Sequence, residues 1–112
     1  MTEETPEVTV SRSTEYERYE ISVDGQQAGL AAYTDSGTQR IFHHTEIGED
    51  FGGRGLGSTL IARALAETRD AGMRIVPVCP FVAKYLEKHH EMDDLVDPVT
   101  EEARAVVRER SG

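Results

Sequence analysis

The chain has 112 residues, a net charge of −9, 38% hydrophobic residues and 29% charged residues. This composition predicts one globular domain with a modest core and excludes wholesale disorder. No apolar run approaches the roughly 18–20 residues that cross a membrane. The acidity argues against nucleic acid or an anionic membrane as a partner, because phosphate backbones are bound by clustered lysine and arginine. It is compatible with a cationic substrate such as an amine, and equally with acidity that serves only solubility.

The N-terminus predicts no secretory signal, because its first ten residues, MTEETPEVTV, are acidic and lack an apolar stretch. The single cysteine, Cys79, cannot form an internal disulfide. Together these features predict a cytoplasmic protein. Residues 1–15 are polar and are expected to be a mobile acidic tail. Residues 16–112 are expected to form the single domain.

Three strands joined by two turns are predicted between Tyr19 and Ile47. The Asp24-Gly25 pair is a strong hairpin signal, since glycine readily adopts the positive φ that a type I′ turn needs. A second turn is expected at residues 35–37, with the sequence DSG. Apolar residues alternate with polar ones beside these turns, which favours half-buried strands.

From Gly55 onward the apolar spacing becomes helical and predicts a helix that ends near Gly72. The apolar face consists of Leu56, Leu60, Ile61, Ala64, Leu65 and Thr68.

The rest of the chain predicts a buried strand over Met73–Val78 and a short helix from Pro80. Phe81 and Tyr85 share one face of this helix at i, i+4 spacing, and Phe81 is expected in the core. A last helix is expected from Pro98, with Asp97 as its N-cap. Three strands followed by helix, strand and helices indicate an α+β fold.

A cluster of glycines directly precedes the first predicted helix: Gly52, Gly53, Gly55 and Gly57. The first amides of a helix have no internal partners and attract anions, and glycines let a phosphate approach closely. Arg54 adds a positive charge there. The alternative is a glycine-rich turn without a ligand, although idle glycines cost about 0.5–1 kcal/mol each relative to alanine. The pattern favours binding of a pyrophosphate.

Two common phosphate loops do not fit this segment. A P-loop requires lysine where this chain has Ser58, and the GxGxxG fingerprint read from Gly53 also meets Ser58 at its third glycine. The acetyl-coenzyme A loop R/Q-x-x-G-x-G/A is matched by Gly55 and Gly57, with Gly52 in place of the first arginine or glutamine.

Three segments in order, HHTEI (43–47), GRGLG (53–57) and PVCPFVAKYLEKH (77–89), resemble the small single-domain branch of the GCN5-related N-acetyltransferase superfamily. The resemblance spans residues 17–96. It implies a compact α+β fold whose mixed sheet contains two splayed parallel strands, without the acceptor-side helices of larger relatives. Pro77 agrees with such a splay, because proline removes a ladder hydrogen bond and is normally excluded from a central strand.

The same resemblance implies acetyl-coenzyme A as cofactor. Its pantetheine arm would bind the backbone from Thr45 to Ile47, Lys88 would reach its phosphates, and Tyr85 would lie beside the thioester sulfur as a general acid. The pyrophosphate would bind the loop residues Gly53, Arg54, Gly55, Leu56, Gly57 and Ser58.

Candidate catalytic residues lie at the ends of two predicted strands. His44 and Glu46 share one face of an extended strand and are expected to face the cleft as base, with His43 on the other face. The alternative is that they are ordinary exposed strand residues. Cys79 is expected to carry the acetyl group, to line the pocket, or to be a small buried hydrophobe. His89 and His90 point apart on the chain, so no metal site is expected.

The resulting hypothesis is an acetyl-coenzyme A-dependent N-acetyltransferase acting on a small amine or a protein amine. A second reading is a coenzyme A-binding module with little catalysis, and a third is an interaction domain without a ligand. The acceptor site would be shallow, open, or completed by a second subunit, which leaves a homodimer open.

Overall fold

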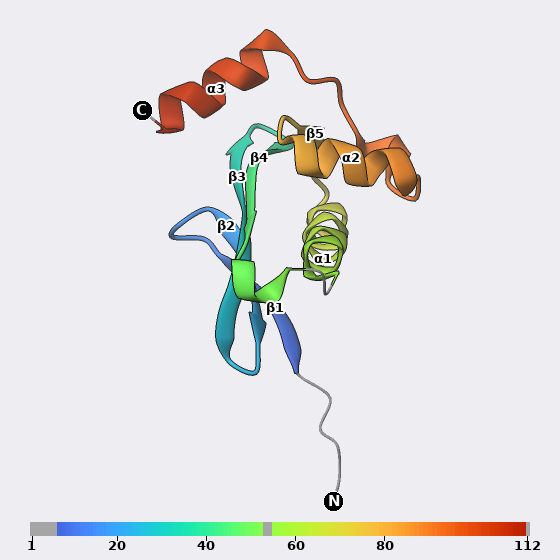
Figure 1. Cartoon of the computed structure of the whole chain (residues 1–112). Coiled ribbons are helices and arrows are strands. Elements are labelled where there is room, and N and C mark those ends of the chain that lie inside the picture. The colour runs from blue at the N-terminus through green and yellow to red at the C-terminus, as the bar shows by residue number, and fades with distance from the viewer. Residues whose placement is uncertain (1–6, 53–54, 112) are drawn as a thin grey trace, which may run out of the picture.

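The computed structural model describes residues 7–52 and 55–111 (Figure 1). One five-stranded sheet follows the chain order β1-β2-β3-β4-β5. Its strands are β1 (Val8–Ser13), β2 (Arg18–Val23), β3 (Gln26–Ser36), β4 (Gln39–Ile47) and β5 (Arg74–Pro77). The helices are α1 (Leu56–Asp70), α2 (Pro80–Lys88) and α3 (Glu101–Ser111), with short 3-10 turns η1 (Glu49–Phe51) and η2 (Asp93–Leu95). The predicted α+β architecture is confirmed.

Tight turns join the antiparallel strands β2, β3 and β4. Asp24 and Gly25 both have positive φ, 51° and 85°, as a type I′ hairpin requires. Strand β3 continues through Ser36, so the second turn lies at Gly37 (φ 59°) and Thr38, slightly later than predicted. β5 then joins the sheet parallel to β4.

Residues 8–13 are not part of a tail: they form β1, which pairs antiparallel with β2 from Val8 to Ser13. Most side chains of β1 are exposed, and Val10 packs against the core as a partly buried residue. The strand is therefore held mainly by backbone hydrogen bonds to β2. A hydropathy pattern carries little signal for such a strand, which explains why the sequence predicted a tail.

Helix α1 covers one face of the sheet and carries the main core. It begins after Gly55 (φ 72°) and ends before Gly72 (φ 74°), both in the left-handed region that favours glycine. All six predicted core positions of this helix are buried. In the described part of the chain, no helix is long and apolar enough to cross a membrane.

Helix α3 packs on the opposite face, where Ala103 meets Ile41 and Val76. Its N-cap is Thr100, whose Oγ1 accepts a hydrogen bond from the Ala103 amide at 3.1 Å, so the prediction of Asp97 as N-cap is wrong. The Asp97 carboxylate instead accepts hydrogen bonds from Gln39 Nε2 and Arg74 Nε, at 2.8 and 2.7 Å, ahead of the helix.

One arginine of β4 is buried in the core beside two tyrosines. Arg40 is 3% exposed and donates two hydrogen bonds to the Asp35 carboxylate, at 2.8 and 3.0 Å. It also donates to the Tyr19 hydroxyl at 2.6 Å and lies 4.5 Å from the centre of the Tyr33 ring. The charge is therefore fully partnered inside the core.

Candidate functional site

The two parallel strands part halfway along β4. β5 pairs with β4 only from Gln39 to Phe42 and ends at Pro77, whose partner is Phe42. The Cys79 amide donates one more hydrogen bond to the Phe42 carbonyl (2.8 Å), and the chain then enters α2 at Pro80. Within the described residues, the rest of β4 (residues 43–47) pairs only with β3. This register confirms the predicted splay and leaves one backbone edge of β4 open.

Alternate side chains at the end of β4 face α1 and α2. Thr45 lies opposite Ala31, and Ile47 lies opposite Gly29, on the face that packs against α1. Thr45 Oγ1 is 3.3 Å from Cys79 Sγ, so the two groups are within hydrogen-bond distance. The structure thus brings together two of the predicted site residues, one from β4 and one from the start of α2.

His44 and Glu46 lie on the other face of the sheet, opposite Ala32 and Leu30. His44 Nε2 is 2.8 Å from Glu46 Oε2, and the side chains are 55% and 63% exposed. The prediction that they share a face is confirmed. They are nevertheless separated from Cys79 by the thickness of the sheet, so they could act on a reacting centre only through the gap beside β4.

His43 does not face away from His44 as predicted. The register of β4 shifts between Ala32 and Tyr33, which leaves His43 as an extra residue in a bulge. His43 lines a hollow with Ala32 and Arg110, on the same side as α3. Burial lowers the pKa of His43 below its usual value. Such a bulge interrupts the simple alternation on which the prediction relied.

The start of α1 faces the open end of the gap. Within the described part of the chain no side chain caps this helix, so the amides of Leu56, Gly57 and Ser58 remain available to an anion. Two residues of the predicted loop, Gly53 and Arg54, lie outside the described residues.

A cavity of about 280 Å³ connects the end of β4 with the start of α1. Its walls are Ile47, Phe51, Gly52, Gly55, Leu56, Gly57, Ser58 and Phe81. Five of the predicted cofactor-binding residues, Ile47, Gly55, Leu56, Gly57 and Ser58, therefore border one cavity, whereas Thr45 and Lys88 are not among its lining residues. An extended ligand lying along the end of β4 would reach the first amides of α1 there.

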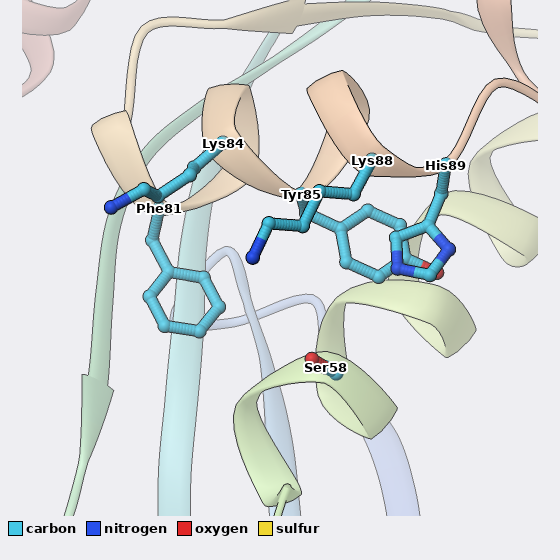
Figure 2. A pocket seen from close by; sticks show the side chains of 6 residues that line it. All are labelled: Ser58, Phe81, Lys84, Tyr85, Lys88 and His89. Carbon is cyan, nitrogen blue, oxygen red and sulfur yellow. The ribbon is translucent and has the colours of Figure 1, made fainter.

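A second cavity of about 140 Å³ lies between α1 and α2 (Figure 2). Both lysines of the chain, Lys84 and Lys88, line it from successive turns of α2, and Ser58 lines it from α1. In a chain of net charge −9, these two ammonium groups give the cavity a local positive charge. Lys84 was missed from the sequence, although its i, i+4 spacing with Lys88 is a visible signal.

Tyr85 lines the same cavity and stacks on His89, with ring centroids 4.2 Å apart. Burial, and then the charge of Glu91, raise the pKa of the Tyr85 phenol. The hydroxyl therefore keeps its proton at neutral pH, as a general acid must.

Phe81 was expected in the core, but its side chain is 42% exposed. Its ring instead rests on Gly57: a methyl group added at Gly57 would lie 2.4 Å from the ring Cζ. The absence of a side chain at Gly57 therefore allows the Phe81 ring to rest against the first turn of α1.

Cys79 is a buried free thiol that directly precedes the first residue of α2. The neighbouring histidines have other partners, since His89 stacks on Tyr85 and His90 Nδ1 lies 3.1 Å from an Asp93 carboxylate oxygen. Among the described residues, no group of three or more histidine, cysteine or acidic side chains is placed to hold a metal ion.

Comparison with known proteins agrees with this architecture. The fold is similar to the NMR structure of a GCN5-like protein from Staphylococcus aureus (TM-score 0.63, 19% identity), covering 83% of this chain and 91% of that one. It is also similar to the crystal structure of Ard1 from Thermoplasma volcanium (TM-score 0.52, 20% identity), covering 70% of this chain and 56% of that one. A comparison with curated proteins finds no match.

The family assignment comes from the sequence itself. A family model described as GCN5-related N-acetyl-transferase matches residues 18–95, which include β2 to β5, α1 and α2. The match covers every element around the gap and both cavities. The chain therefore belongs to the GCN5-related N-acetyltransferase family and is an acetyltransferase.

Proposed function

We propose that the chain transfers an acetyl group from acetyl-coenzyme A to the nitrogen of an amine, either a small molecule or a protein amine. The observation that carries the proposal is the continuity of the site. The open edge of β4, the first amides of α1 (which no side chain caps within the described residues) and both lysines of the chain follow one another around Ser58.

The residues present fit the chemistry of coenzyme A. A pantetheine arm offers amides that can pair with the open backbone edge around Thr45 and Ile47, as an added strand would. A diphosphate suits the amides at the start of α1. The cofactor's remaining phosphate suits Lys84 and Lys88, which donate as point charges. Bound there, the cofactor supplies an activated acetyl thioester.

The chain's own groups have distinct tasks in this proposal. The resemblance to the family implies that Tyr85, held protonated by burial, donates a proton to the departing thiolate. His44 and Glu46 take the proton from the incoming amine, which approaches from their face of the sheet. The nitrogen then bonds to the carbonyl carbon as the carbon–sulfur bond breaks.

Cys79 has two alternative roles at this site. It either accepts the acetyl group before the amine does, or it lines the pocket beside Thr45. Mass spectrometry of the protein quenched after mixing with acetyl-coenzyme A separates them, because only the first role adds an acetyl group that Cys79→Ala removes.

The proposal is tested first by ligand binding. Coenzyme A at one hundred times its dissociation constant should raise the free energy of unfolding by about 2.7 kcal/mol. Lys84→Gln and Lys88→Gln should weaken binding and reduce its salt dependence, whereas Arg104→Gln, an exposed cation on α3, should change neither.

Turnover is tested by release of free thiol from acetyl-coenzyme A in the presence of a panel of amines. Acetyl transfer that falls in His44→Ala and Glu46→Ala, with coenzyme A binding intact, supports the catalytic roles. Tight binding of coenzyme A without acetylation of any amine would instead identify a coenzyme A-binding module. If coenzyme A does not stabilise the protein, both the acetyltransferase and the binding module are ruled out.

A further inference from the structure

Phe81 occupies an unusual position for an aromatic side chain. It is one of three large hydrophobic residues that are exposed in the described part of the chain, yet it lies at the centre of the site. Its ring lines the cavity at the start of α1 and also the cavity that contains the two lysines. Phe81 and Ser58 are the residues that the two cavities share.

The ring separates these cavities because it rests on the side of α1. Three ring atoms would lie 2.4, 3.2 and 3.3 Å from a methyl group added at Gly57, which is tighter than normal packing allows. Figure 2 shows the ring extending from α2 toward the first turn of α1, with Lys84 and Lys88 on the same helix. The partition therefore depends on the absence of a side chain at Gly57.

Neither cavity is large enough alone for an elongated cofactor. Their volumes are about 280 and 140 Å³, whereas sites for drug-sized ligands are roughly 300–1,000 Å³. A ligand that reaches from the end of β4 to the lysines must pass the Phe81 ring. At 42% exposure, the ring is held by few neighbours and can change rotamer quickly.

We propose that Phe81 is a movable partition in the cofactor site: its ring rests on Gly57 in the free protein and swings away when the cofactor binds, joining the two cavities. The inference rests on the proposed function, because it takes coenzyme A as the ligand. Only the fraction of molecules with the ring displaced can bind a ligand that spans both cavities. The ring thereby slows entry of the cofactor.

The test combines a spectroscopic signal with association kinetics. The chain has three phenylalanines, so 4-fluorophenylalanine labelling gives three fluorine resonances, and Phe81→Leu identifies the one from Phe81. Addition of coenzyme A should shift that resonance. In stopped-flow mixing, Phe81→Ala should raise the association rate constant for coenzyme A about threefold or more. Tyr16→Ala, which removes an exposed aromatic ring away from the site, should leave the rate constant unchanged.

The outcomes separate the two proposals. If coenzyme A stabilises the protein but the Phe81 resonance does not move and Phe81→Ala binds at the wild-type rate, the ring is a fixed wall and the partition is rejected. If coenzyme A binds neither the wild type nor Phe81→Ala, the proposed function is rejected and the partition with it. The fluorine measurement uses the unsubstituted sequence, so it decides the matter even where Phe81→Ala does not fold.

Discussion

Replacing Arg40 with methionine is expected to lower the free energy of unfolding by about 3–5 kcal/mol, because it removes two hydrogen bonds to the Asp35 carboxylate and one to the Tyr19 hydroxyl, and hydrogen bonds of charged groups contribute about 1.5–3 kcal/mol each. The side chain is 3% exposed and donates hydrogen bonds to Asp35 and Tyr19. Methionine fills similar space, so the loss comes mainly from the charge and its hydrogen bonds. Domains of this kind have total stabilities of about 5–15 kcal/mol, so the substitution removes a large share.

Substituting either partner of Arg40 should lower the free energy of unfolding by less. Asp35→Asn keeps an acceptor for one hydrogen bond but removes the negative charge beside the buried guanidinium, so it should cost about 1–3 kcal/mol. Tyr19→Phe removes the hydrogen bond from Arg40 (2.6 Å) and a longer one to Glu67 (3.4 Å), and should cost about 1 kcal/mol. Burial disfavours the charged form of Arg40, but the Asp35 hydrogen bond and the neighbouring phenols raise its pKa overall, which keeps the guanidinium charged.

Urea denaturation of the four proteins measures these differences, provided that the slope m stays constant. The expected order of destabilisation is Arg40→Met first, then Asp35→Asn, and Tyr19→Phe last. A loss below about 1 kcal/mol for Arg40→Met would show that the desolvation cost of the charge cancels its interactions. In that case the reasoning from the hydrogen-bond network fails.

Three further predictions concern β3, the segment before α3, and its cap. Gly29→Ala places a methyl group 2.5 Å from a carbonyl oxygen of β4, and should cost about 1–3 kcal/mol in urea denaturation because backbone must move. Hydrogen bonds from Gln39 and Arg74 lower the pKa of Asp97 below its usual 3.8. The ionised carboxylate therefore contributes its full share of the folding stability above pH 3.8, and this share is lost as the pH falls through the lowered pKa. Asp97→Asn should therefore flatten the pH dependence of the free energy of unfolding below about pH 4. The prediction is wrong if this dependence is the same in the variant and in the wild type. Thr100→Ala removes the α3 cap and should cost about 1 kcal/mol, a loss that Thr100→Ser restores.

Much of the fold followed from local patterns. The Asp24-Gly25 hairpin and the periodic face of α1 predicted their elements closely, because turn chemistry and helical burial act within a few residues. Pro77 correctly indicated where β5 leaves β4. These features required no knowledge of distant contacts.

The errors came from interactions that local patterns do not contain. Strand β1 depends on backbone pairing with β2, and Asp97 is engaged by Arg74 from another element. The bulge at His43 reversed the expected face of that side chain. Phe81 appeared as a core residue by helical spacing, but its partner is a glycine on α1. Each of these outcomes depends on which element lies opposite.

The place of α1 in the chain links core packing to the affinity for the cofactor proposed to bind at its first turn. This helix connects β4 to β5, and it contacts β2, β3, both of these parallel strands and α2. A cavity created between α1 and the sheet, for example by Leu60→Ala, would let the helix shift toward the sheet and would move its first amides relative to the edge of β4. Substitutions far from the ligand, at residues that never touch it, should therefore weaken binding in proportion to how far they let α1 shift.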